Sequence, residues 1–194
     1  MSLIAAAGSV LAAARRYGHD GCLVGGLAVS VRCDPRFTRD VDLAITVAGD
    51  ADAEVLIRSL TADGLSAQML VEQEAVGRLA MVRLTDRNGI SIDMLLASSG
   101  IEAEIVSAAE SIEVVNGVRM PVARVGHLIA MKLLSVGAMR ETDSADLRSL
   151  ASVATMDDWS LAAEAVALIQ LRGFARGRPL ADDLERLRAT STAG

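Results

Sequence analysis

The spacing of hydrophobic residues changes several times along the chain and predicts a mixture of helices and strands. Apolar side chains recur every three to four positions over residues 2–17, and Gly18 ends that helical pattern. Shorter apolar or alternating runs, typical of strands, follow it. The pairs Asn88-Gly89 and Asn116-Gly117 each lie between two such runs and predict two β-hairpins. Up to residue 123 we expect helices at 2–17, 27–32, 51–63 and 101–109, and strands at 22–24, 40–46, 66–71, 78–85, 90–97, 112–115 and 118–122.

From Arg124 onward the helical spacing continues to the end of the chain, with helices expected near 124–137, 143–154, 157–172 and 180–189. The pattern therefore predicts an α/β (α+β) fold in two parts. Residues 1–123 form a core with a small mixed β-sheet flanked by helices. Residues 124–194 form a C-terminal helical bundle.

The composition fits a folded protein and excludes several classes. The chain has 194 residues, 52% of them hydrophobic, which excludes a disordered chain and suffices for a sizeable core. No apolar run reaches the roughly 20 residues that a membrane span needs. The apolar N-terminal segment is followed, not preceded, by Arg15 and Arg16, unlike a signal peptide. Cys22 and Cys33 make neither a disulfide framework nor a zinc cluster. We expect a cytoplasmic protein with free thiols.

The first candidate site is the pair Asp40 and Asp42 in an expected strand. Side chains alternate along a strand, so both carboxylates lie on one face, about 7 Å apart. They repel each other unless a cation lies between them, and hard oxygen ligands suit Mg²⁺ or Mn²⁺. The alternative is a solvated strand face that carries two acids.

Asp93 is the second candidate because it is the charged residue in the apolar strand expected at 90–97. If this strand lies beside that of Asp40 and Asp42, the three carboxylates can hold two divalent ions. Such a centre serves in-line phosphoryl or nucleotidyl transfer. The alternative is an edge-strand residue that points into solvent.

Gly25-Gly26 ends one expected strand and begins a helix, which directs free backbone N–H groups toward that point. Glycine also allows a phosphate to approach the backbone closely. An ordinary tight turn is the alternative for this pair taken alone. The order of strand, Gly-Gly, helix, D-x-D strand and a later strand with one Asp is more specific than any of its parts.

Lys132 is the single lysine among 19 basic residues, and it lies in an otherwise apolar helix. An unpaired charge is costly there, so its side chain either reaches solvent or meets an anion. An ammonium retained in an arginine-rich chain favours a phosphate contact.

Residues 23–29 (LVGGLAV) and 36–43 (RFTRDVDL) resemble the signature of the DNA polymerase β-like nucleotidyltransferase superfamily. The Thr-x-Asp-x-Asp form and residues 121–133 (PVARVGHLIAMKL) are most similar to abortive-infection, AbiEii-type nucleotidyltransferases, the toxins of two-gene toxin–antitoxin systems. The resemblance extends from about Cys22 to Leu150. It implies a nucleotidyltransferase fold and an enzyme that uses an NTP and two Mg²⁺ (or Mn²⁺) ions.

The resemblance also implies a role for each matching residue. Asp40 and Asp42 hold both metal ions, and Asp93 holds the catalytic ion beside the acceptor hydroxyl. Lys132 contacts the triphosphate, Asp146 supports the site from the next helix, and Asp143 lies between them. The implied nucleotide-binding residues are Gly25, Gly26, Thr38, Arg39, Lys132 and Arg140. Some superfamily members have Gly-Ser in place of Gly25-Gly26, so phosphate contact here is mostly through the backbone.

The acceptor is open from the sequence. The net charge of −6 does not favour nucleic acid overall, yet arginines gather before the D-x-D strand and near the C-terminus, at positions 32, 36, 39, 172, 176 and 178. The leading hypothesis is a toxin that modifies the tRNA 3′ end, with a cognate antitoxin as a possible partner. The alternatives are a small-molecule (antibiotic) nucleotidyltransferase and a non-catalytic binding protein with the same fold.

Overall fold

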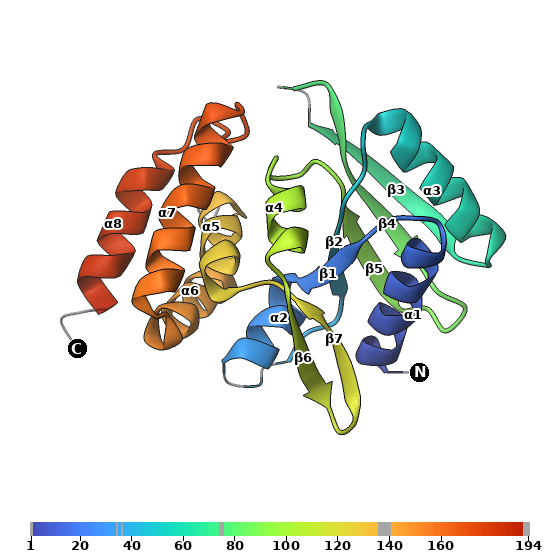
Figure 1. Ribbon diagram of the computed structural model, residues 1–194, viewed down its shortest axis with the longest axis horizontal. Coiled ribbons are helices and arrows are strands. Elements are labelled where there is room, and N and C mark those ends of the chain that lie inside the picture. Colours follow the sequence, from blue (N-terminus) through green and yellow to red (C-terminus); the bar gives the residue numbers. More distant parts are fainter. Residues whose placement is uncertain (1, 34, 36, 74–75, 136–140, 192–194) are drawn as a thin grey trace.

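The computed structural model describes residues 2–33, 35, 37–73, 76–135 and 141–191. A twisted sheet occupies one side of the molecule, and helices α5–α8 are stacked on the other (Figure 1). The strands are β1 (Gly21–Val24), β2 (Val41–Ile45), β3 (Ser66–Gln73), β4 (Arg78–Thr85), β5 (Ser91–Leu95), β6 (Glu110–Val115) and β7 (Val118–Val122). The helices are α1 (Leu3–Arg16), α2 (Gly25–Arg32), α3 (Asp50–Ala62), α4 (Glu102–Ser107), α5 (Val125–Ser135), α6 (Glu141–Val153), α7 (Met156–Leu171) and α8 (Leu180–Ser191).

The seven strands form one mixed sheet in the order β3-β4-β5-β2-β1-β7-β6. Strand β2 runs parallel to β5, and β1 runs parallel to β7, while the other neighbours are antiparallel. The two hairpins predicted from Asn-Gly pairs, β4–β5 and β6–β7, are both confirmed. Gly89 and Gly117 each adopt a φ of +77°, which glycine takes without strain.

Each helix and strand predicted from the sequence is present, and the boundaries differ by a few residues. The largest functional difference is at α2, which begins at Gly25 instead of Leu27. Both glycines are therefore part of the helix start. Strand β2 begins at Val41, so Asp40 lies just before the strand and not within it.

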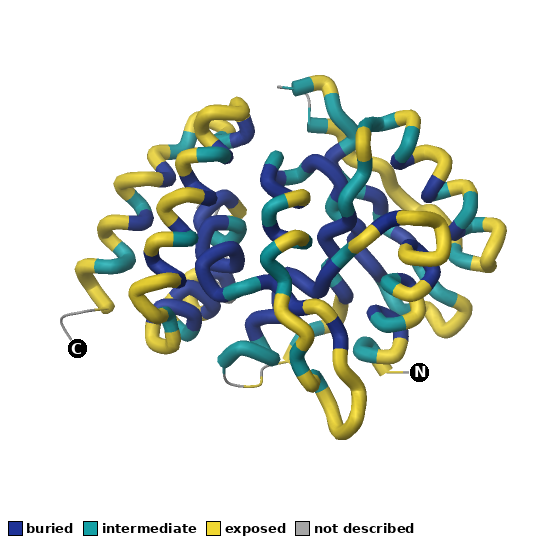
Figure 2. The backbone as a smooth tube through the Cα atoms, in the orientation of Figure 1, coloured by how far each residue is buried: buried dark blue, intermediate teal, exposed yellow. Residues whose placement is uncertain are grey.

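One hydrophobic core runs from α1 through the sheet to α8 (Figure 2). Helices α1, α2 and α4 contact the central strands β1 and β2, and α5 contacts α2, α6, α7 and α8. Helices α5 and α7 cross closely at Gly126, where a Cβ atom would lie 2.3 Å from the Asp158 carbonyl oxygen. The core is continuous across residue 124, and the division into two domains there remains a proposal.

Within the described part of the chain, no helix is both long and apolar enough to cross a membrane.

Candidate active site

Three charged residues stand in one row across the middle of the sheet. Asp42 on β2 pairs with Asp93 on the parallel neighbour β5, and Asp93 pairs with Arg83 on the antiparallel neighbour β4. Residues at the same level of adjacent strands project to the same face, about 5 Å apart. The condition for a carboxylate cluster, that the Asp93 strand lies beside that of Asp42, is met.

Asp93 is buried in a central strand, with 8% of its surface exposed. The alternative of an edge-strand acid in solvent is therefore wrong. Two hydrogen bonds of 2.6 Å hold its carboxylate, one from Arg83 Nε to Oδ1 and one from Arg83 Nη2 to Oδ2. The sequence reasoning missed Arg83. The register of the β4–β5 hairpin, which places these two residues opposite each other, is the signal that could have identified it.

The surroundings of the Asp42 carboxylate disfavour its ionised form. Burial, and next the negative charge of Asp93, raise its pKa from 3.8 to about 6. A backbone hydrogen bond from Gly26 and the charge of Lys132 act in the opposite direction. The protein thus compensates the negative charge of Asp42 only in part. An acid on a solvated strand face would be stabilised by water and would keep its ordinary pKa, so that alternative does not fit Asp42.

Gly25 leaves space that Asp42 uses. Its φ is +62°, and a Cβ atom built on it would lie 2.0 Å from Asp42 Oδ2. Any other residue at this position would both strain the backbone and collide with the carboxylate. The Gly-Gly pair is therefore more than an ordinary turn, because it lets a helix N-terminus approach the acid directly.

Lys132 on α5 meets two anions within the protein. Its Nζ lies 2.8 Å from Asp143 Oδ1 and 2.7 Å from Asp146 Oδ2, both on α6. The lysine side chain is 14% exposed, and the aspartate side chains are 7% and 1% exposed. Of the two alternatives for Lys132, solvent or an anion, the structure has the anion. The predicted contact with a triphosphate is a separate matter and remains a prediction.

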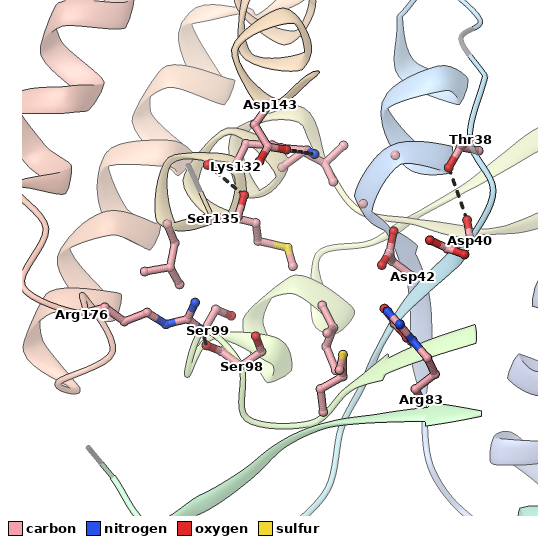
Figure 3. A pocket seen from close by; sticks show the side chains of 18 residues that line it. Thr38, Asp40, Asp42, Arg83, Ser98, Ser99, Lys132, Ser135, Asp143 and Arg176 are labelled. Atoms are coloured by element: carbon pink, nitrogen blue, oxygen red, sulfur yellow. Dashed lines mark hydrogen bonds and ion pairs between the residues drawn. The ribbon is translucent and has the colours of Figure 1, made fainter. Parts of the chain in front are cut away.

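A single cavity of about 750 Å³ joins these groups. Asp40, Asp42 and Arg83 lie on one side of it, Lys132 and Asp143 lie across from them, and Arg176 reaches in beside Ser98 and Ser99 (Figure 3). Such a volume suits a ligand the size of a nucleotide. The described residues that line the cavity are Gly25, Gly26, Thr38, Asp40, Asp42, Met81, Arg83, Asp93, Leu95, Ser98, Ser99, Leu128, Met131, Lys132, Leu134, Ser135, Asp143 and Arg176.

Two of the predicted site residues that the structure describes, Asp146 and Arg39, are not among the residues that line this cavity. Asp146 is paired with Lys132 at 2.7 Å, and its supporting role remains a prediction. Arg39 is exposed, with its guanidinium 5.7 Å from the centre of the Phe37 ring, and it does not belong to the described lining. Arg140 lies outside the described residues.

Asp40 and Asp42 fit a divalent cation better than any other described groups of the cavity. Both are carboxylates, Asp40 is exposed to solvent, and the raised pKa of Asp42 marks a negative charge that a cation would relieve. In the part of the chain that the structure describes, no group of three or more His, Cys, Asp or Glu side chains is arranged to hold one metal ion. Asp93 points into the same cavity, but Arg83 takes up its carboxylate.

Most of the arginines considered for a basic surface form hydrogen bonds to other groups of the same chain. Arg32 donates to Glu110, Arg172 donates to Glu104, and Arg178 donates to Asp183. Arg176 donates to the Ser98 carbonyl oxygen at 2.9 Å and lines the cavity. Arg36 lies outside the described residues.

Comparison with known proteins identifies the fold. No protein-family model matches the sequence, and no curated protein matches it. A solved antigenic nucleotidyltransferase-like protein from Paracoccidioides brasiliensis is similar in structure, with a TM-score of 0.54, 17% identity, and coverage of 96% of this chain and 92% of that chain. This likeness shows that the chain has the nucleotidyltransferase fold.

Two further solved structures are more distant. A lincosamide antibiotic adenylyltransferase with lincomycin bound aligns with a TM-score of 0.48 and 15% identity, over 76% of this chain and 95% of that chain. The CCA-adding enzyme of Thermotoga maritima, complexed with tRNA, aligns with a TM-score of 0.40 and 12% identity, over 97% of this chain and 50% of that chain.

Proposed function

We propose that this protein is a nucleotidyltransferase that transfers a nucleoside monophosphate from an NTP to a hydroxyl acceptor and releases pyrophosphate. The observation that carries the proposal is the register of Asp42 opposite Asp93, beside a helix N-terminus that only glycine can bring so close. Both carboxylates and both glycines line one cavity of nucleotide size.

The residues divide into a metal side and a phosphate side. Asp40 and Asp42 would hold divalent Mg²⁺ or Mn²⁺, with Asp93 as the third carboxylate of a two-ion centre. When bound, such ions favour ionisation of the acceptor hydroxyl and neutralise charge on the leaving pyrophosphate. Gly25, Gly26 and Thr38 would contact the triphosphate.

Lys132 faces the same cavity from the helical part and would contact the triphosphate as well. Arg39 and Arg140 are further nucleotide-binding candidates from the family resemblance. Asp146 would position Lys132, because its Oδ2 lies 2.7 Å from the Lys132 Nζ.

In the reaction, the acceptor oxygen bonds to the α-phosphorus of the NTP while the bond from that phosphorus to the α,β-bridging oxygen breaks. The bonding electrons leave with pyrophosphate, and the hydroxyl proton passes to a carboxylate of the site or to water. The protein positions the two reactants, which accounts for much of the rate acceleration in phosphoryl-type transfer.

For the acceptor we propose a hydroxyl on a small molecule, such as an antibiotic. The pairing of Arg32, Arg172 and Arg178 with carboxylates supports it, because neutralised arginines attract an RNA backbone weakly. The second candidate is the tRNA 3′ end, modified by an AbiEii-type toxin of the cytoplasm with a cognate antitoxin. Arg176 favours this second candidate, because it lines the cavity and donates to the neutral Ser98 carbonyl oxygen, so its positive charge can attract an RNA phosphate.

The test is transfer of label from each of four α-³²P NTPs, with Mg²⁺, to total tRNA and to a panel of aminoglycosides and lincosamides. The variant Asp42→Asn should abolish transfer. The variant Asp157→Asn is the matched control, because Asp157 is an exposed acid at the start of α7 and should leave transfer unchanged.

Label on a drug supports the first acceptor, and label on tRNA supports the second. Transfer that survives in Asp42→Asn contradicts the proposed site. The absence of label on every acceptor, with no pyrophosphate released, favours a non-catalytic binding protein.

A further inference from the structure

The ion pair between Arg83 and Asp93 has no role in the function proposed so far. Both carboxylate oxygens of Asp93 accept a hydrogen bond of 2.6 Å from the same guanidinium. Bidentate pairs of this kind are the strong form of the arginine–carboxylate interaction. The acid that would complete a two-ion centre is thus already bound to a cation that belongs to the protein.

The pairing follows from the sheet. Arg83 and Asp93 are directly opposite in the antiparallel β4–β5 hairpin, and Asp42 is directly opposite Asp93 on the other side. Asp93 therefore has a positive neighbour on one side and a partly compensated carboxylate on the other. The side chains of Asp42 and Arg83 lie on the same side of the cavity, one on each side of the Asp93 strand (Figure 3).

We propose that Arg83 is the resident counter-ion of Asp93 and controls the number of divalent ions in the site. With Arg83 in place, the protein without nucleotide binds one divalent ion, at Asp40 and Asp42. A second ion binds only when the guanidinium leaves Asp93. This inference rests on the proposed function, since it assumes that the carboxylates bind metal.

Arg83 is the member of the pair that can move. Its side chain is 37% exposed, whereas that of Asp93 is 11% exposed and is fixed on a central strand. Arg83 also lines the cavity, where the phosphates of an NTP would be alternative anionic partners. When Arg83 pairs with a phosphate and the second ion pairs with Asp93, no charge in the cavity is left unpaired.

The test is the number of Mn²⁺ ions bound to the full chain in the absence of nucleotide, measured by electron paramagnetic resonance. We expect one ion for the wild type and two for Arg83→Met. The matched control is Arg78→Met, which removes an arginine from the same strand. Arg78 pairs with Asp50 away from the cavity, so this variant should bind one ion.

Equal numbers of bound ions in the wild type and in Arg83→Met would overturn the inference, whether that number is one or two. If Arg83→Met does not fold, Arg83→Lys replaces it, because an ammonium can occupy only one oxygen of Asp93. A folded lysine variant that binds a single ion would also overturn the inference. If neither the wild type nor any variant binds an ion, the proposed function itself is contradicted. If the wild type binds an ion that Asp42→Asn loses, the proposed metal site stands, and the comparison with Arg83→Met then tests the inference alone.

Discussion

At the scale of single residues, Asp42 is the most informative position. It combines burial, a carboxylate neighbour across the strand pair, and a glycine that only just leaves it room. Such an arrangement opposes the ionised form of the acid. A protein tolerates it where a ligand supplies the missing charge, which is typical of functional sites.

The first prediction concerns the stability of Asp42→Asn. Between pH 3.8 and about 6, the unfolded chain has released the Asp42 proton while the folded protein retains it, so the free energy of unfolding falls as the pH rises. Above this range the penalty is fully present, and without divalent ions the asparagine variant should be more stable than the wild type by roughly 3 kcal/mol. Urea unfolding at pH 7.5 and pH 4 measures the difference, most of which should be lost at the lower pH. A less stable variant at pH 7.5 would contradict the electrostatic account.

The second prediction concerns two properties of Gly25, its left-handed backbone and the space that it leaves for the Asp42 carboxylate. In Gly25→Ala, a left-handed backbone costs about 1 to 2 kcal/mol, and the new methyl group displaces the Asp42 carboxylate. We expect Mn²⁺ binding to be lost as well as stability. The control is Gly18→Ala, since Gly18 has a φ of +87° but no atom within 4 Å of its would-be Cβ. That variant should lose only the backbone cost of about 1 to 2 kcal/mol and bind Mn²⁺ normally, and equal binding by both variants would contradict the role of Gly25.

At the scale of helices and strands, α5 and α6 are joined through one lysine. Lys132 connects the buried Asp143 and Asp146, and all three come from the part of the chain that follows the sheet. The same lysine lines the cavity opposite Asp42. Packing of the helical part and the shape of the site are therefore linked.

The third prediction is that Lys132→Met destabilises the fold by about 3 to 5 kcal/mol, because it leaves two buried carboxylates without their cation. The comparison variant is Arg58→Met, which breaks an exposed pair with Glu54 on α3 and should cost less than about 1 kcal/mol. Chemical denaturation at neutral pH measures both. A loss below 1 kcal/mol for Lys132→Met would contradict the structural role of this lysine.

The helices and strands could be predicted from the sequence because they depend on local patterns of residues. Side-chain periodicity and Asn-Gly turns predict the helices and both hairpins without knowledge of the tertiary structure. The pairing of Asp42 with Asp93 could be stated only as a condition, since parallel strands join residues that are far apart in the chain. Arg83 was missed because its importance depends on the register of one hairpin. The ion pairs of Lys132 depend on the packing of α6 against α5, which no local pattern of residues indicates.

At the scale of the whole molecule, the cavity lies where the sheet meets the C-terminal helices. Asp42 and Arg83 reach it from the sheet, and Lys132 and Arg176 reach it from the helical part (Figure 3). The hydrophobic core continues between the two parts, so the walls of the cavity are held together by packing. A nucleotide in this cavity would contact both parts at once.

The most direct test of the account is a crystal structure with Mn²⁺ and a non-hydrolysable NTP, with the ions located by anomalous scattering. The account predicts an Mn²⁺ ion coordinated by Asp40 and Asp42, with the triphosphate between Gly25 and Lys132. A nucleotide bound elsewhere, or an Asp42 carboxylate without metal while the nucleotide is bound, would contradict it.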